Sequence, residues 1–128
     1  MIQSKDDYLN FLEKDKQALY RTSKYPSIID DIWKFERLLR KTEYYNNCRN
    51  DFLGRVYCII LKYRLNRYRI QLGLNIPINV CDKGLFIVHY GDITINSNAK
   101  IGKNCKIYNG VVIGSKGFGG VVPLLEIM

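Results

Sequence analysis

The chain has 128 residues, of which 47% are hydrophobic and 25% charged, so it has room for one domain or two very small ones. No apolar run approaches the roughly 20 residues that a membrane-spanning helix needs, and residues 1–7 contain no apolar signal-peptide core, so we expect a cytoplasmic protein without a membrane span. The four cysteines form no CxxC or Cys/His pair, which argues against a zinc site.

The first half of the chain predicts three helices. Apolar residues recur there at helical spacing over three segments, about 6–21, 28–45 and 51–72. Ser4 or Asp6 is expected to cap the first helix and Ser27 the second, while Gly73 stops the third in a left-handed conformation. No motif for chemistry occurs in these helices, so we interpret their apolar stripes as core and subunit contacts.

The chain has a net charge of +8, and much of the excess positive charge lies in a basic, tyrosine-rich stretch from Lys62 to Arg69. Such a stretch can follow the phosphates of a nucleic acid and stack on its bases. It is more often a solvated helix face whose tyrosines and leucines pack inward. We adopt the second interpretation and expect no nucleic-acid partner.

After residues 73–77 the helix formers give way to β-branched residues, Asn and Gly, first in an irregular segment (76–94) and then in a regular one. An isoleucine returns every six residues, at 95, 101, 107 and 113, and a small or β-branched residue usually follows four places later. Period six fits neither a helix nor simple strand alternation. It predicts short strands on the three faces of a prism, with the isoleucines inside and about eighteen residues per coil. An antiparallel meander with Gly/Asn turns is the alternative.

His89 is the single histidine, in the segment Gly84-Leu-Phe-Ile-Val-His-Tyr-Gly91. It follows an inward isoleucine closely, so we expect it on or beside a corner of the prism. A neutral imidazole near pH 7 suits the removal of a proton from an alcohol that attacks an acyl carbonyl. A histidine that is simply hydrogen-bonded at a turn is the alternative.

The chain resembles the serine acetyltransferase family, especially its members from polysaccharide clusters. Four features carry the resemblance: the N-terminal helices, an Ile-Pro junction, the motif Gly-Leu-x-Ile-x-His-x-Gly-x-Ile over residues 84–93, and the hexapeptide repeats. The resemblance implies an α+β chain: an α-helical N-terminal domain (1–74) followed by a short, truncated left-handed parallel β-helix (75–128). It also implies acetyl-CoA as acyl donor, bound outside the β-helix between subunits of a homotrimer. His89 would be the general base, and the chemistry would need no metal.

Two positions depart from the family pattern. The family places an Asp directly before the catalytic histidine, where this chain has Val88, and a second Asp near Asn75 usually orients that histidine. Asp82 and Asp92 are the candidate substitutes for the orienting carboxylate. The acceptor is therefore left open between serine and a sugar hydroxyl.

The hexad register stops after residue 114, although the family continues for several coils. Gly117, Gly119 and Gly120 form a glycine-rich loop that could approach CoA. Shifting the reading frame of the possible codons from Val122 onward can restore a hexapeptide coil, so we hypothesise that a frameshift truncated a longer gene. The alternative to an active enzyme is an inactive fragment or an assembly module whose helices bind a related enzyme.

Overall fold

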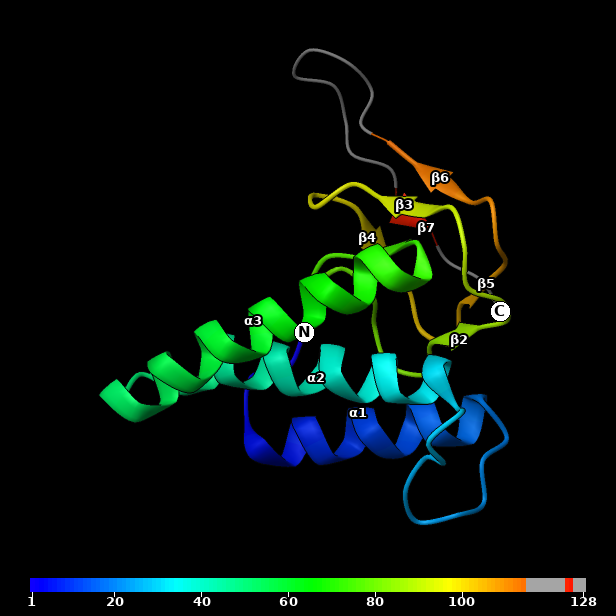
Figure 1. Ribbon diagram of the computed structural model, residues 1–128. Helices are drawn as coiled ribbons and strands as arrows, with labels where there is room; N and C mark the ends of the chain where they lie inside the picture. Colours follow the sequence, from blue (N-terminus) through cyan, green and yellow to red (C-terminus); the bar gives the residue numbers. More distant parts are fainter. Residues whose placement is uncertain (115–123, 126–128) are drawn as a thin grey trace.

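The computed structural model describes residues 1–114 and the short strand at 124–125, and it is an α+β structure of three helices followed by short parallel strands (Figure 1). The helices are α1 (Lys5–Ala18), α2 (Asp31–Cys48) and α3 (Phe52–Leu72), and α2 packs against both of the others. The strands are β1 (Leu74–Asn75), β2 (Phe86–Ile87), β3 (Ile93–Ile95), β4 (Lys100–Ile101), β5 (Lys106–Ile107), β6 (Val112–Ile113) and β7 (Leu124–Leu125).

Two of the expected helix ends are confirmed. The hydroxyl of Ser4 accepts a hydrogen bond from the backbone N–H of Asp7 (3.0 Å), so Ser4 caps α1. Gly73 ends α3 with φ = 65°, the left-handed conformation that glycine adopts without a steric penalty.

The predicted start of α2 is wrong. Asp30 caps this helix in place of Ser27, because its carboxylate accepts from the N–H of Trp33 (3.3 Å) and is also held by Arg21 (2.7 and 3.2 Å). Ile28 and Ile29, expected on the apolar stripe of the helix, lie in the preceding turn with 86% and 85% of their surface exposed.

The strands form three small parallel sheets, which the chain visits in a repeating order. One sheet has the order β1-β3-β6, the second pairs β2 with β5, and the third pairs β4 with β7 and includes a bridge from Cys81 to Ile101. We call residues 74–92 the first pass through the three sheets and residues 93–111 the second pass. Parallel pairing of strands such as β3 and β6 (Thr94 with Val112) excludes the antiparallel meander for these strands.

The predicted isoleucine interior is confirmed. Ile95, Ile101 and Ile107 are buried in one hydrophobic cluster, and Ile113 packs against it. The same cluster continues into the helices through Phe35, Leu39, Leu61 and Leu65. One continuous core therefore joins the helices to the two passes of strands.

Charged side chains also join the two halves, at a boundary that is closed to solvent. Arg40 of α2 is buried and donates to the carboxylate of Asp15 (2.7 and 3.3 Å) and to Glu43 (3.0 Å). It donates as well to the backbone carbonyls of Cys81 (2.7 Å) and Asp82 (2.8 Å) in the first pass. A buried guanidinium needs this many acceptors, because each unsatisfied N–H would cost free energy.

The carboxylates around Arg40 accept hydrogen bonds from the backbone of the first pass. Asp15 accepts from the N–H groups of Gly84 and Leu85 (both 3.0 Å). Two further carboxylates do the same: Glu43 accepts from Asn79 (2.8 Å) and Glu36 accepts from Ile87 (3.2 Å). We call Asp15, Glu36, Arg40 and Glu43 the ionic seam.

Candidate functional site

His89 lies directly beyond β2, in the turn that leads to β3. Its position is fixed by backbone hydrogen bonds on both sides: the N–H of Val88 donates to the carbonyl of Ile107 (2.8 Å), and the carbonyl of Gly91 accepts from the N–H of Gly110 (3.2 Å). The side chain of His89 is exposed. The pairing of β2 with β5 therefore holds a solvent-accessible imidazole at the end of a strand.

No group within residues 1–114 forms a hydrogen bond or an ion pair with the imidazole of His89. The alternative interpretation, a histidine hydrogen-bonded at its turn, requires such a partner, and residues 1–114 provide none. Neither ring nitrogen has a hydrogen-bond partner among these residues, so a nitrogen of a neutral imidazole is available to accept a proton from a bound hydroxyl.

In the described residues, neither candidate orienting carboxylate forms a hydrogen bond or an ion pair with His89. Asp82 is half-buried, its carboxylate accepts from the N–H of Lys83 (2.7 Å), and its carbonyl accepts from Arg40. Asp92 is exposed and follows Gly91, which has φ = 115°. The carboxylate of Asp82 therefore bonds within its own turn, and only the backbone carbonyl of Asp82 reaches Arg40 of the ionic seam.

The other expected positions can be placed in part. Val88, at the position of the family's aspartate, is half-buried, and Asn75 is exposed in β1, where it pairs with Thr94 of β3. Gly117, Gly119 and Gly120 lie outside the described residues, so the loop that could approach CoA stays a prediction. In the described part of the chain, no group of three or more His, Cys, Asp or Glu side chains is arranged to hold a metal ion.

Sequence reasoning missed the ionic seam, which supports the segment that carries His89. A signal was present: Glu36, Arg40 and Glu43 lie four and three residues apart, on a helix face that otherwise carries buried apolar residues. Asp15 likewise lies four residues after the buried Phe11 of α1 and four residues before Leu19, the buried C-cap of that helix. Charged residues at core spacing predict a buried, paired cluster.

Burial and the neighbouring charges shift the pKa values of the groups in the ionic seam. Burial raises the pKa of Glu36 well above its usual value, and the negative charge of Asp15 raises it further. For Arg40, burial lowers the pKa, but the charges of Asp15 and Glu43 more than offset this and the pKa is raised. Arg40 is therefore charged at any ordinary pH, while Glu36 keeps its proton to a higher pH than an exposed glutamate does.

No protein-family model, no curated protein and no solved structure matches this chain. None of the helices in the described residues is long and apolar enough to cross a membrane. The strand pattern and the residues around His89 are therefore the features of this chain that bear on its function.

Proposed function

We propose that the chain is an acetyl-CoA-dependent O-acetyltransferase of the hexapeptide-repeat type, similar to serine acetyltransferases. In this proposal residues 75–128 wind as a left-handed parallel β-helix. The observation that carries it is the strand pattern: the chain returns to the same three parallel sheets, with isoleucines six residues apart in one interior. Acyltransferases of this type use such a stack as a rigid wall for the acyl donor.

His89 is the general base of the proposed reaction. Its imidazole accepts the proton of the acceptor hydroxyl while the oxygen forms a bond to the carbonyl carbon of the acetyl group. The tetrahedral intermediate then collapses, the carbon–sulfur bond breaks, and the CoA thiolate takes the proton back from the imidazolium. The exposure of His89 supports this role, because the base must reach a substrate that enters from solvent.

The acceptor is the hydroxyl of serine or of a sugar. Val88 is apolar, so the residue before His89 provides no carboxylate for the ammonium group of serine. This difference favours acceptors without a positive charge. Sugars meet that condition, and serine does not.

The experiment measures release of free CoA thiol from acetyl-CoA with serine or with a neutral sugar as acceptor. We expect His89→Gln to lower kcat/KM by about 10²–10⁴-fold, the usual contribution of a general base. Tyr90→Phe, a change at the exposed neighbour in the same turn, is the matched control and should leave the rate unchanged. Equal rates for wild type and His89→Gln would exclude this base, and absence of turnover with every acceptor would exclude the enzyme.

A second candidate function, an assembly module, is favoured by the exposed face of α3. This helix buries Leu61 and Leu65 on one side and exposes large apolar residues on the other. The exposed set is Phe52, Leu53, Val56, Ile59, Ile60, Tyr63 and Ile70. We call this set the apolar face of α3. A large exposed apolar patch commonly marks a protein contact.

The charge of α3 indicates which partner would cover this face. The helix contains basic residues and no Asp or Glu between Phe52 and Leu72. Packing against the same helix of a second copy would bring like charges together, which is unfavourable. We therefore assign the face to an amphipathic helix of a related enzyme, with Asp and Glu beside its apolar stripe.

Binding of a designed amphipathic peptide with glutamates beside its leucines tests this second candidate. Ile59→Ser should abolish binding, whereas Ile29→Ser, which changes another exposed isoleucine that lies outside α3, should leave it intact. A peptide with lysines in place of the glutamates should not bind. Self-association of the wild type that Ile59→Ser removes would instead assign the face to a second copy, and no binding of the acidic peptide would exclude the assignment.

A further inference from the structure

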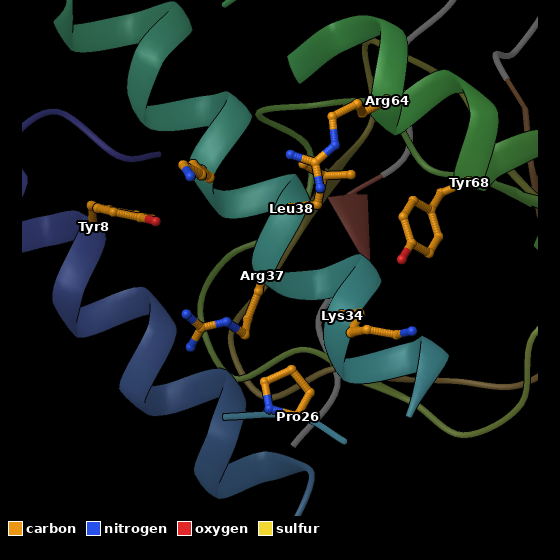
Figure 2. A pocket seen from close by; sticks show the side chains of 8 residues that line it. Tyr8, Pro26, Lys34, Arg37, Leu38, Arg64 and Tyr68 are labelled. Carbon is orange, nitrogen blue, oxygen red and sulfur yellow. The ribbon is translucent and has the colours of Figure 1, made fainter. Parts of the chain in front are cut away.

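A pocket of about 230 Å³ lies over one face of α2, away from His89 in sequence and lined by a different set of residues. Its lining includes four cationic side chains and two tyrosines (Figure 2). The cations are Lys34, Arg37, Lys41 and Arg64, and the tyrosines are Tyr8 and Tyr68. We call these six residues the basic pocket.

Helix geometry explains why the cations share this pocket. Lys34, Arg37 and Lys41 are three and four residues apart along α2, so they lie on one face of that helix. Arg64 and Tyr68 are four residues apart on α3 and form a second wall. In Figure 2, Arg64 and Tyr68 lie on one side of α2, and Tyr8 of α1 lies on the opposite side of α2.

The positive charge of the basic pocket is largely uncompensated. Of the residues that the structure describes, no Asp or Glu lines it. Within residues 1–114, Lys34 alone of the four cations has a carboxylate at ion-pair distance, that of Asp31 (3.3 Å). Like charges at this helical spacing repel each other, and an anion in the pocket would relieve the repulsion.

Two of the cations are held in place by aromatic rings. The guanidinium of Arg37 lies 5.4 Å from the ring centre of Tyr25, and the ammonium of Lys41 lies 5.1 Å from the ring centre of Tyr57. Such contacts restrict the motion of a side chain but leave its positive charge in place. Less side-chain entropy is then lost when an anion binds.

We propose that the basic pocket binds the phosphate groups of a small phosphorylated molecule. Guanidinium groups bind phosphate oxygens in a bidentate manner, and ammonium groups add point charges. The positive charge of four cations is larger than one carboxylate can neutralise. It therefore suits a ligand with several negative charges, such as a diphosphate. The volume is below the ~300–1,000 Å³ of pockets for drug-sized ligands, so the recognised group is small.

Titration calorimetry with inorganic pyrophosphate at constant ionic strength tests the proposal on the full chain. We expect saturable binding to the wild type. Arg64→Gln and Arg37→Gln should each weaken binding about tenfold, a typical loss for one charge-assisted contact. Arg67→Gln is the matched control, because Arg67 is also exposed on α3, three residues from Arg64, but does not line the pocket.

Two outcomes would overturn the proposal. One is the absence of saturable pyrophosphate binding to the wild type. The other is an equal loss in Arg64→Gln and Arg67→Gln, which would indicate general attraction to a basic surface. Circular dichroism of each variant establishes that it is folded. The His89→Gln variant should bind pyrophosphate as the wild type does, so the result is independent of the acetyltransferase proposal.

Discussion

The first pass of strands has two sides, and each satisfies the backbone in a different way. Toward the second pass, the N–H groups of Phe86 and Val88 donate to backbone carbonyls of residues 105 and 107. Toward the helices, the N–H of Ile87, which lies between them, donates to the carboxylate of Glu36. Successive N–H groups of a strand point in opposite directions, so Glu36 occupies the position that an earlier parallel strand would otherwise fill.

The same contrast holds along the rest of this segment. The N–H of Asp82 donates to the carbonyl of Ile101 in the second pass, whereas its own carbonyl accepts from Arg40 of the helices. An unpaired strand edge is unfavourable when buried and prone to association when exposed. The ionic seam therefore closes one end of the strand stack. It does so with buried ionisable groups, of which Arg40 forms ion pairs with Asp15 and Glu43.

The largest expected effect comes from removing the centre of the seam. Arg40→Met should lower the free energy of unfolding by about 3–5 kcal/mol, because Asp15 and Glu43 would be left buried without their cation. That loss is a large part of the roughly 5–15 kcal/mol of a typical domain. Urea unfolding followed by far-UV circular dichroism measures it.

Arg37→Met is the control for this change, since Arg37 lies on the same helix and is only half-buried. It should cost less than about 1 kcal/mol. Equal losses in the two variants would mean that the seam does not hold the first pass to the helices.

The apolar side of the comparison is tested by Ile101→Ala. This change removes a buried side chain from the strand interior and should cost about 3 kcal/mol, the sum of lost transfer free energy and an unfilled cavity. Val112→Ala, at an exposed position of β6, should cost less than about 1 kcal/mol. If both variants unfold at the same urea concentration, the isoleucines do not form the interior that stabilises the stack.

Contact between the two passes is tested at Gly84. This glycine has φ = 81°, and a Cβ atom there would lie 3.1 Å from the backbone nitrogen of Asn104 and in collision with its side-chain oxygen. Gly84→Ala should therefore cost about 2 kcal/mol, from backbone strain and from displacement of Asn104. Gly110→Ala has a similar φ of 84° with open space around it, so it should show only the strain, about 1 kcal/mol. A smaller loss at Gly84 than at Gly110 would argue against close packing of the passes.

The smallest effect is a change in pH dependence at Glu36. Its pKa is raised in the folded state by burial and by Asp15, so the folded protein holds a proton that the unfolded chain releases above about pH 4.5. The stabilisation is complete below that pH and is lost as the pH rises toward the raised pKa. Glu36→Gln stays neutral, so its stability should fall less than that of the wild type between pH 4.5 and 8.

Chemical unfolding at a series of pH values measures this difference. Glu13→Gln, a change of an exposed glutamate on α1, should follow the wild-type profile. A Glu36→Gln profile parallel to that of the wild type would show that Glu36 does not carry the pH dependence.

The sequence was most informative where a local pattern repeats. The isoleucines at 95, 101 and 107 could be assigned to an interior because each recurs in the same local context, and their burial confirms it. The inward packing expected for Tyr63 is wrong, since its side chain is 65% exposed, while Leu65 is buried as expected. α3 carries apolar residues on opposite faces, and only contact with α2 decides which face is buried.

Contacts between residues far apart in the sequence could not be predicted either. Asp15 bonds to the backbone of Gly84, 69 residues later, and no local pattern specifies that contact. For the candidate site, the sequence predicted that His89 closely follows an inward isoleucine, and the structure confirms that Ile87 is buried at the end of β2. The role of His89 as general base stays a prediction. The sequence could not show that the carboxylate of Asp82 accepts from the N–H of Lys83, because that contact depends on how this segment folds.

The side-chain cap on the first pass also gives the strand stack a direction of assembly. The helices that provide Asp15, Glu36, Arg40 and Glu43 precede the strands, so they leave the ribosome first. Each later strand then finds its hydrogen-bonding partner already made, whether a carboxylate or an earlier strand. A circular permutant that places the helices after the strands would have to begin with an unprotected edge, and we expect it to refold slowly and to aggregate during synthesis.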